Sequence, residues 1–445
     1  MKYPAYPAYT ATDPNGASFP APWPVQRLRF HIQSNPVRSE VAHLAPETLV
    51  TFVPMEAVHE WGGMDTSAER EVGDVSNGYT YFANGDVVIA KITPCFENGK
   101  GAIAQGLSNG VGFGTTELHV IRPNESLSNR WVFYLTMSHL FRKRGEAEMF
   151  GAGGQKRVPE DFIRNLRVGI PSLDEQERIA DFLDWRTAQI DALIAKKQAL
   201  IERLQENREA VIRHAVSGAL DGQSVFKDSG VKWLGAIPEH WSVSKIKFVA
   251  EIASGHTPSR SVDEYWQDCT IPWVSLNDSK TLRERDFISE THYQISELGL
   301  ANSSARLLPA GVVVFSRDAT VGLCAITEVP MAVSQHFIAY ICGERLLPKF
   351  LLLVLKAMQQ HLRSLQTGST IVTIGMPEVR GLETPLPPLE EQLAIVKHID
   401  DECASLDESL RLARDAIEKL TEYRSALITA AVTGQIDVRG VPVPV

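Results

Sequence analysis

The sequence predicts an α+β protein built by internal tandem duplication, in which two mixed α/β domains are separated by two long helices that pair as an antiparallel coiled coil. Three observations predict this fold: a stretch that recurs 216 residues later, helix signals over the whole of both copies, and short strand-like runs between them. The 445 residues suffice for two to four domains, at about 100 to 200 residues per domain.

The repeat joins the middle of the chain to its end. Residues 170–221 align without a gap on residues 386–437, and about 19 of the 52 positions are identical. Fainter matches lie upstream, where the run from Trp23 to Phe30 resembles the run from Trp241 to Phe248. The chain is therefore predicted to alternate domain, helix, domain, helix, with the two domains more diverged than the two helices.

Each repeated stretch carries helix signals at both ends. Prolines at 171 and at 387–388 precede acidic residues, which suits the N-terminal turn of a helix. Gly218 and Gly434 stand where a left-handed C-terminal residue belongs. The roughly 44 residues between these signals predict two helices, each about 65 Å long at 1.5 Å per residue.

An apolar seam at alternating steps of three and four residues predicts that the two helices pair with each other. Antiparallel pairing would put the two domains at opposite ends of the pair. Lys197 and the matched Arg208 and Arg424 interrupt the seam, so two separate helices, each lying on its own domain, stay open as an alternative. The predicted seam residues are Ile190, Ile194, Ile201, Leu204, Val211, Leu406, Leu410, Ile417, Leu420 and Leu427.

The domains between the helices contain β-branched and aromatic runs, such as residues 87–89 and 312–315, separated by Gly, Pro, Asn and Asp turns. Together these signals divide the chain into an extended N-terminal segment at 1–22, a first domain at 23–169, a first long helix at 170–222, a second domain at 223–385, a second long helix at 386–437 and a tail at 438–445.

No motif for bond chemistry is complete. The turn Glu148 to Gly154 resembles that of S-adenosylmethionine binders, but Ala152 replaces its first glycine, and the residues 278–280 lack the Pro-Asp that precedes a nuclease Asp-x-Lys. The five cysteines and twelve histidines have no metal-ligand spacing. We therefore expect no catalytic residue and no metal ligand in this chain, and a function in binding.

The net charge of −10 at first argues against a nucleic-acid partner, but residues 172–221 and 388–437 together carry −9 of it. The domains are nearly neutral. The first contains basic clusters that suit phosphates, and both contain polar side chains that could hydrogen-bond base edges. Solvated helix ends and surface turns remain an equal or stronger alternative for any one of them. The candidate contacts are Lys91, Thr115, Thr116, Arg142, Lys143, Arg144, Gln155, Lys156, Arg157, Arg317, Ser334, Gln335, Ser369 and Thr370.

Three longer motifs carry a family resemblance. The segment 226–243, the Pro-x-Leu-x-Glu-Gln start of both helices and their Ala-Val-Ser/Thr-Gly ends resemble the specificity subunit of type I restriction-modification systems. The resemblance implies two target recognition domains, each reading one half of a split site in double-stranded DNA through the major groove. It also implies that the paired helices set the spacer length and dock two methyltransferase subunits, which recruit restriction and translocation subunits.

The same resemblance assigns adenine methylation and cleavage to those partners, which would use S-adenosylmethionine, ATP and Mg²⁺, with no cofactor in this chain. Independently of the resemblance, the composition, with 44% hydrophobic residues and no apolar run long enough to cross a bilayer, predicts a cytoplasmic protein with no membrane partner. The segment 3–22 departs from the family pattern, and the loop 367–373 lacks the basic residues of Gly151–Arg157. Two other functions stay open: a helical scaffold that binds only proteins, and a fragment of a single-chain restriction-methylase.

Overall fold

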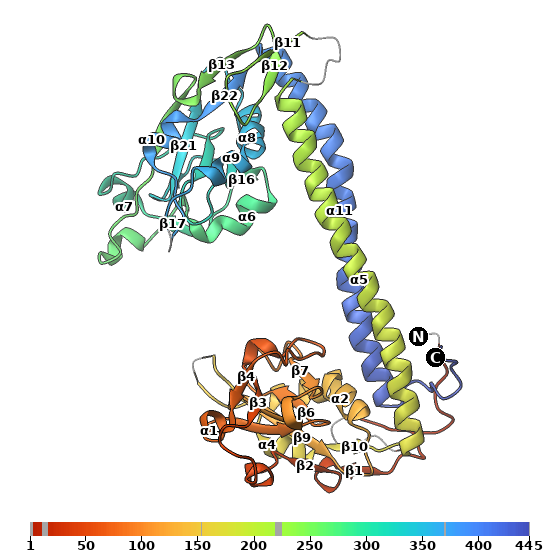
Figure 1. The fold of residues 1–445 in the computed structure, drawn as a ribbon. Coiled ribbons are helices and arrows are strands. Elements are labelled where there is room, and N and C mark those ends of the chain that lie inside the picture. The colour runs from red at the N-terminus through yellow and green to blue at the C-terminus, as the bar shows by residue number, and fades with distance from the viewer. Residues whose placement is uncertain (1–2, 11–16, 153, 219–224, 369–370, 445) are drawn as a thin grey trace. The chain divides into compact units, whose positions relative to one another are not determined.

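The chain forms two compact units that cut across its sequence order. The computed structural model describes residues 3–10, 17–152, 154–218, 225–368 and 371–444. The first unit comprises Met1–Gln198 and Asp415–Val445, and the second comprises Ala199–Arg414. Each unit therefore holds one mixed α/β domain, the beginning of the helix that follows it and the end of the other long helix, as the colours of Figure 1 let the reader follow.

The domain of the first unit is built on two four-stranded sheets, in the orders β2-β9-β6-β7 and β4-β3-β8-β5, with a separate β1-β10 pair. Its strands are β1 Val25–Arg27, β2 Ile32–Ser34, β3 Leu49–Val53, β4 Glu69–Glu71, β5 Thr80–Ala83, β6 Val87–Ala90, β7 Gly101–Ile103, β8 Val111–Gly114, β9 Leu118–Pro123 and β10 Arg167–Gly169, and its helices are α1 Val72–Val75, α2 Asn129–Met137, α3 His139–Ala147 and α4 Glu160–Asn165.

The domain of the second unit has a five-stranded sheet in the order β14-β21-β18-β19-β16, a three-stranded sheet β17-β15-β20 and the pairs β13-β22 and β11-β12. Its strands are β11 Phe226–Asp228, β12 Ala236–Pro238, β13 Ser242–Lys245, β14 Ala250–Ser254, β15 Ile271–Val274, β16 Phe287–Ile288, β17 Tyr293–Ile295, β18 Val313–Ser316, β19 Cys324–Thr327, β20 Ala332–Val333, β21 Phe337–Cys342 and β22 Glu383–Leu386, and its helices are α6 Ser279–Glu284, α7 Glu297–Ala301, α8 Pro348–Ala357, α9 Gln359–Ser364 and α10 Met376–Gly381.

The two long helices are α5, Leu173–Val216, and α11, Leu389–Val432, each of 44 residues. The predicted fold class of two α/β domains and two long helices is confirmed. Among the described residues, no helix is both long enough and apolar enough to span a bilayer.

Ion pairs join the two long helices in both units, and both pairs come from the same duplicated positions. Arg424 contacts Asp191 at 2.9 Å in the first unit, and Arg208 contacts Asp407 at 3.0 Å in the second. The two residue numbers of each pair add up to 615, as one antiparallel register requires. The arginines that interrupt the predicted seam therefore bridge the helices, which excludes the alternative of two separate helices. All ten predicted seam residues are buried or half-buried.

A buried glutamine anchors the start of each long helix to its domain. In the first unit, Gln176 accepts the backbone N–H of Ser128 at 2.7 Å and donates to the backbone oxygens of residues 126 and 171. In the second unit, the matched Gln392 accepts the N–H of Leu347 at 2.9 Å and donates to the oxygens of residues 345 and 387. The repeated Glu-Gln sequence thus recurs because both helices satisfy the same buried backbone groups.

The glutamate that precedes this glutamine accepts a hydrogen bond from a tryptophan in both units. Trp23 donates its indole N–H to Glu175 at 3.1 Å, and Trp241 donates to Glu391 at 2.8 Å. The N-terminal segment departs from the repeat but fills an equivalent place, because Tyr6 donates its hydroxyl to Glu175 at 2.7 Å where His240 contacts Glu391 at 2.9 Å. A tyrosine from the N-terminus and a histidine from the repeat therefore serve the same carboxylate position.

Each long helix ends at a glycine that packs closely against a proline. Gly218 has φ +85°, and a Cβ there would lie 2.3 Å from the Cδ atom of Pro238. Gly434 has φ +71°, and a Cβ there would lie 2.2 Å from the Cγ atom of Pro20. The predicted left-handed glycines are confirmed, and the structure adds a second reason for glycine, the close approach of a proline.

Candidate nucleic-acid interface

The two domains share a backbone frame around one basic residue each. Lys91 follows β6 and donates its backbone N–H to the oxygen of Glu117 at 2.9 Å. Arg317 follows β18 and donates to the oxygen of His336, also at 2.9 Å. The backbone oxygen of each basic residue also accepts a hydrogen bond of 2.9 Å, from the N–H of Val158 for Lys91 and from the N–H of Ile374 for Arg317. Lys91 and Arg317, predicted separately from the sequence, thus occupy the same position.

The glycine-containing loops also close in the same way. Phe150 and Arg157 exchange backbone hydrogen bonds of 3.2 and 2.9 Å, and Thr367 and Thr373 exchange two of 2.9 Å. Each loop ends beside the basic residue of the frame, since Arg157 bridges to Ile92 and Thr373 bridges to Asp318. Two predicted contacts in the second loop, Ser369 and Thr370, lie outside the described residues.

In the first unit an ion pair joins the loop to the strand segment. Two nitrogens on one edge of the Arg157 guanidinium, Nε and Nη2, each donate to a different oxygen of Glu117 at 2.8 Å. The Arg157 guanidinium holds the pKa of Glu117 below its usual value. Gln155 and Lys156 are exposed in the loop, and Thr116 is exposed beside Glu117. Thr115 is half-buried and accepts the N–H of Glu117 at 3.3 Å. These five predicted residues therefore lie on neighbouring segments.

In the second unit a hydrogen-bonded chain replaces that ion pair. Asp318 accepts the hydroxyl of Thr373 and contacts Nδ1 of His336 at 2.9 Å. Nε2 of His336 contacts the Gln335 amide nitrogen at 3.2 Å, and the Gln335 oxygen accepts the hydroxyl of Thr257. The same backbone frame thus carries different polar side chains in the two domains.

This series of hydrogen bonds ends at a cleft of about 180 Å³ whose lining residues all belong to the second unit. The Arg260 guanidinium lies 5.6 Å from the ring of Trp266 and 6.0 Å from the ring of Tyr293. The hydroxyl of Ser334 is buried with no partner among the described residues. The lining residues are Thr257, Arg260, Trp273, Ser275, Leu276, Asn277, Tyr293, Ser334, Gln335 and His336.

Sequence reasoning found Ser334 and Gln335 but missed the rest of the cleft. Arg260, Asn277 and Tyr293 come from three separate segments, and no local spacing connects them with the turn at 334–336. Only the folding of β15, β17 and the β20–β21 turn against one another brings these side chains together.

The prediction that Arg142 contacts DNA is wrong. Its side chain is buried on α3, donates to the backbone oxygen of Phe96 at 2.6 Å and lies 4.6 Å from the ring of that residue. Burial lowers the pKa of Arg142 to about 9. A guanidinium enclosed in this way is out of reach of a phosphate. Its neighbours differ, because Lys143 is exposed and pairs with Glu146 at 2.9 Å, and Arg144 lines a separate cavity described below.

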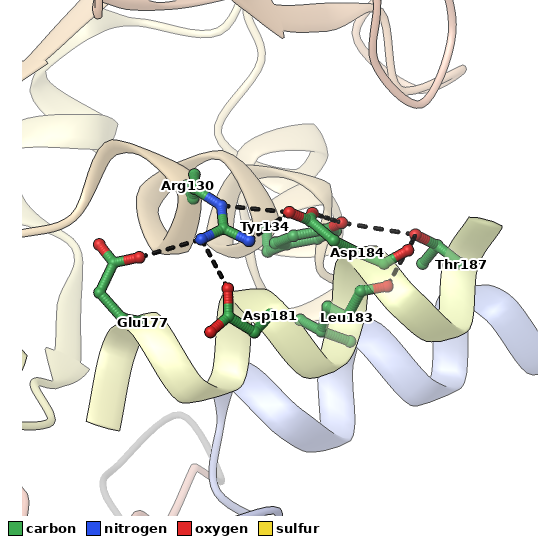
Figure 2. A network of polar contacts seen from close by, with 7 residues as sticks. All are labelled: Arg130, Tyr134, Glu177, Asp181, Leu183, Asp184 and Thr187. Carbon is green, nitrogen blue, oxygen red and sulfur yellow. Dashed lines mark hydrogen bonds and ion pairs between the residues drawn. The ribbon is translucent and has the colours of Figure 1, made fainter. Parts of the chain in front are cut away.

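Charged side chains fasten each domain to the helix that follows it. Figure 2 shows Arg130 of α2 facing three carboxylates of α5, with Glu177 at 3.1 Å, Asp181 at 2.8 Å and Asp184 joined by two nitrogens. Tyr134 also donates its hydroxyl to Asp184, at 2.5 Å. In the second unit Lys349 of α8 contacts Asp400, the repeat partner of Asp184, at 3.3 Å.

Within the described ranges, no group of three or more His, Cys, Asp or Glu side chains could hold a metal ion. The carboxylates of Glu117 and Asp318 are paired within the frame, and its other polar groups are amides, hydroxyls, an imidazole and cations, which suit hydrogen bonding to base edges and pairing with phosphates.

Three relatives of this chain are specificity subunits of type I restriction enzymes. The specificity subunits of the Escherichia coli type I restriction enzymes EcoAI and EcoEI are 51% and 43% identical over 137 and 150 residues, or 30% and 32% of this chain. These matches span 23% and 25% of the two relatives, about a quarter of their length. The HindI specificity subunit of Haemophilus influenzae is 23% identical over 413 residues, covering 79% of this chain and 86% of that protein.

A solved structure shares the fold. A chain from a structure on complex assembly and conformational transition of the type I R-M system superposes with a TM-score of 0.67 at 20% identity, covering 94% of this chain and 99% of that one. The family of type I restriction modification DNA specificity domains matches residues 64–203 and 238–419. Because these two matches cover more than half of the chain, the protein belongs to the type I restriction modification DNA specificity family.

Proposed function

We propose that this chain is the DNA sequence-specificity subunit of a type I restriction-modification complex, and that each domain reads one half of a split site. The observation that carries this proposal is the common frame around Lys91 and Arg317, which presents an Arg157–Glu117 ion pair in one unit and the Asp318–His336 chain in the other. An identical frame with different side chains is what two readers of different half-sites require.

The division of labour follows from the chemistry of DNA. The basic side chains of Lys91, Lys156 and Arg317 bind phosphates, which positions each domain without selecting a sequence. The amides of Gln155 and Gln335 and the hydroxyl of Thr116 hydrogen-bond base edges in the major groove, where each base pair offers its own pattern of donors and acceptors.

The long helices set the distance between the half-sites and dock the partner proteins. Leucines stay exposed on them, with 48% of Leu193 and 40% of Leu200 accessible on α5, and 57% of Leu393 and 53% of Leu412 on α11. Exposed apolar side chains on a paired helix suit a protein partner. The partners are two methyltransferase subunits and the restriction and translocation subunits, which carry out the catalysis with S-adenosylmethionine, ATP and Mg²⁺ while this chain binds no cofactor.

Methylome sequencing tests the function and finds the target. Deleting the gene from its source cell should abolish a bipartite methyladenine motif, and restoring the gene should bring the motif back. Survival of every bipartite motif in the deletion strain would contradict the proposal.

Exchange of one domain tests the two-reader model. Replacing residues 23–169 by those of a relative should change one half of the methylated motif and keep the other, because each unit holds its own frame. Replacing residues 223–385 is the matched control and should change the other half only. A change of both halves in either chimera would refute the model.

A protein-binding scaffold without DNA recognition predicts a different result. In that case the complex of this chain with its methyltransferase subunits would show no salt-dependent affinity for DNA beyond that of the methyltransferase alone.

A further inference from the structure

Two arginines lie directly opposite each other across the short β1-β10 pair of the first unit. Arg27 and Arg167 are register partners, and both are exposed. The neighbouring Leu28 donates its N–H to the oxygen of Leu166 at 3.0 Å, so the arginine pair is of the non-hydrogen-bonded type, in which opposite side chains are closest. Like charges at such a position destabilise a sheet.

The second unit has the same backbone arrangement without this repulsion. Ile246 donates to the oxygen of Leu382 at 2.9 Å, and the register partners at the matching position are Lys245 and Glu383. One unit therefore balances this position with opposite charges, and the other puts two positive charges there. Neither Arg27 nor Arg167 has a side-chain hydrogen bond or ion pair among the described residues.

A cavity of about 580 Å³ collects these charges with a third arginine. It is lined by Arg27 and Arg167 from the strand pair and by Arg144 from α3. The carboxylates of Glu148 and Asp161 also line it, which leaves an excess of one positive charge. The repulsion between Arg27 and Arg167 would be relieved by one bound anion.

The cavity adjoins the glycine-containing loop of the first unit. Its lining residues Glu148 and Pro159 flank the loop that closes between Phe150 and Arg157. Gln155 and Lys156 are exposed in that loop, and they face the same partner under the proposed function. A DNA strand running past the loop offers such an anion as a phosphodiester, whereas a free phosphate would have no reason to sit at this border.

We propose that Arg27, Arg144 and Arg167 form a phosphate-binding site that holds the DNA backbone beside the half-site read by the first domain. This inference rests on the proposed function and adds an asymmetry to it. The first unit grips one more backbone phosphate at this position than the second unit does, because Glu383 occupies the corresponding place there. Contacts of this kind position the protein and are independent of base sequence.

The test is Arg167→Glu, which copies the charge pattern of the second unit. In the full complex with its methyltransferase subunits, we expect weaker binding to a short random-sequence DNA duplex and a slope of log affinity against log salt that is smaller by about 1. The melting temperature should stay equal or rise, because the like-charge pair becomes an opposite-charge pair. A loss of folding can thus be told from a loss of phosphate binding.

Arg29→Glu is the matched control. It changes the net charge by the same amount two residues from Arg27, but Arg29 does not line the cavity. An equal fall in salt slope for both variants would overturn the proposal in favour of a general field effect. If inorganic phosphate raises the melting temperature of the wild type but not of Arg167→Glu, while the two bind DNA alike, the site takes free phosphate and the proposal is also overturned. Absence of DNA binding by the wild-type complex would instead refute the proposed function.

Discussion

Arginine has different roles at different positions of this chain, and the surroundings of each guanidinium decide which. Arg157 lies at the end of an exposed loop and is held by Glu117 at 2.8 Å. Arg424 bridges the two long helices with only 10% of its side chain accessible. Arg142 is enclosed and its pKa falls to about 9, since burial penalises its charged form. A count of basic residues therefore overstates the surface that can face DNA.

Arg142 should matter for stability and not for DNA. We expect Arg142→Ala to lower the free energy of unfolding by about 2 kcal/mol, because the oxygen of Phe96 loses a buried donor and the core a large side chain. Thermal or denaturant unfolding measures this change. The control Lys143→Ala should stay within about 0.5 kcal/mol of the wild type, since that side chain is exposed. A smaller salt slope for DNA binding by folded Arg142→Ala would contradict this assignment.

Asp286 should make the second unit sensitive to acid. Burial tends to raise the pKa of Asp286, but the ammonium groups of Lys356 and Lys349 outweigh it and lower the pKa to about 2 from an ordinary 3.8. Because the folded pKa is the lower one, the carboxylate contributes its full stability above pH 3.8 and loses it as the pH falls toward 2. Asp286→Asn should therefore cost about 2 kcal/mol at neutral pH.

The pH dependence separates this effect from a simple packing loss. Hydrogen exchange in the second unit should show that the difference between wild type and Asp286→Asn shrinks as the pH falls below about 4. A difference that is constant with pH would mean that the carboxylate charge is not the cause.

At the scale of elements, specific side-chain and backbone contacts hold the ends of the long helices in place. The same set of contacts recurs at both junctions: a glutamine on buried backbone groups, a glutamate on a tryptophan, and a glycine under a proline. Each junction joins the start of one helix to the end of the other, because Trp23 contacts both Glu175 and the region of Gly434. This explains why the sequence repeat is strongest where the helices begin and end.

Gly434 should not tolerate a side chain. Gly434→Ala places a Cβ 2.2 Å from Pro20 at a φ of +71°, so both the clash and the left-handed backbone oppose it. We expect a loss of at least about 1 to 3 kcal/mol in unfolding experiments. Gly440→Ala is the control, because nothing lies within 4 Å of a Cβ at that position and its stability should hardly change. Equal stability of the two variants would contradict the close packing at the helix end.

At the scale of the whole molecule, the two ion pairs between α5 and α11 fix one register for the pairing. An insertion in one helix alone shifts every partner beyond it, whereas equal insertions in both helices keep the register. The positions after Gln198 and after Arg414 suit such insertions, since the two units divide there.

Equal insertions should lengthen the spacer of the DNA site. Seven residues in each helix add about 10 Å at 1.5 Å per residue, which corresponds to about 3 base pairs at 3.4 Å each. Methylome sequencing of a strain that carries the double insertion should find both half-sites unchanged and the spacer longer. The control with seven residues in α5 alone should lose methylation or stability, and an unchanged spacer in the double insertion would refute the role of the helices as a ruler.

The sequence by itself determined the duplication, the two long helices and their glycine ends, whereas only the backbone hydrogen bonds of the folded domains show that Lys91 and Arg317 occupy the same position. The duplication, the helices and their glycine ends depend on periodicity and on short-range backbone rules, which a single chain segment expresses without reference to its neighbours. The tertiary structure alone decided that Arg142 is buried, that Arg208 and Arg424 bridge the helices, and that Arg260, Asn277 and Tyr293 share a cleft with Gln335. Burial and proximity of residues far apart in sequence arise from how strands and helices pack. A buried charged residue therefore has a different role from the same type of residue on the surface.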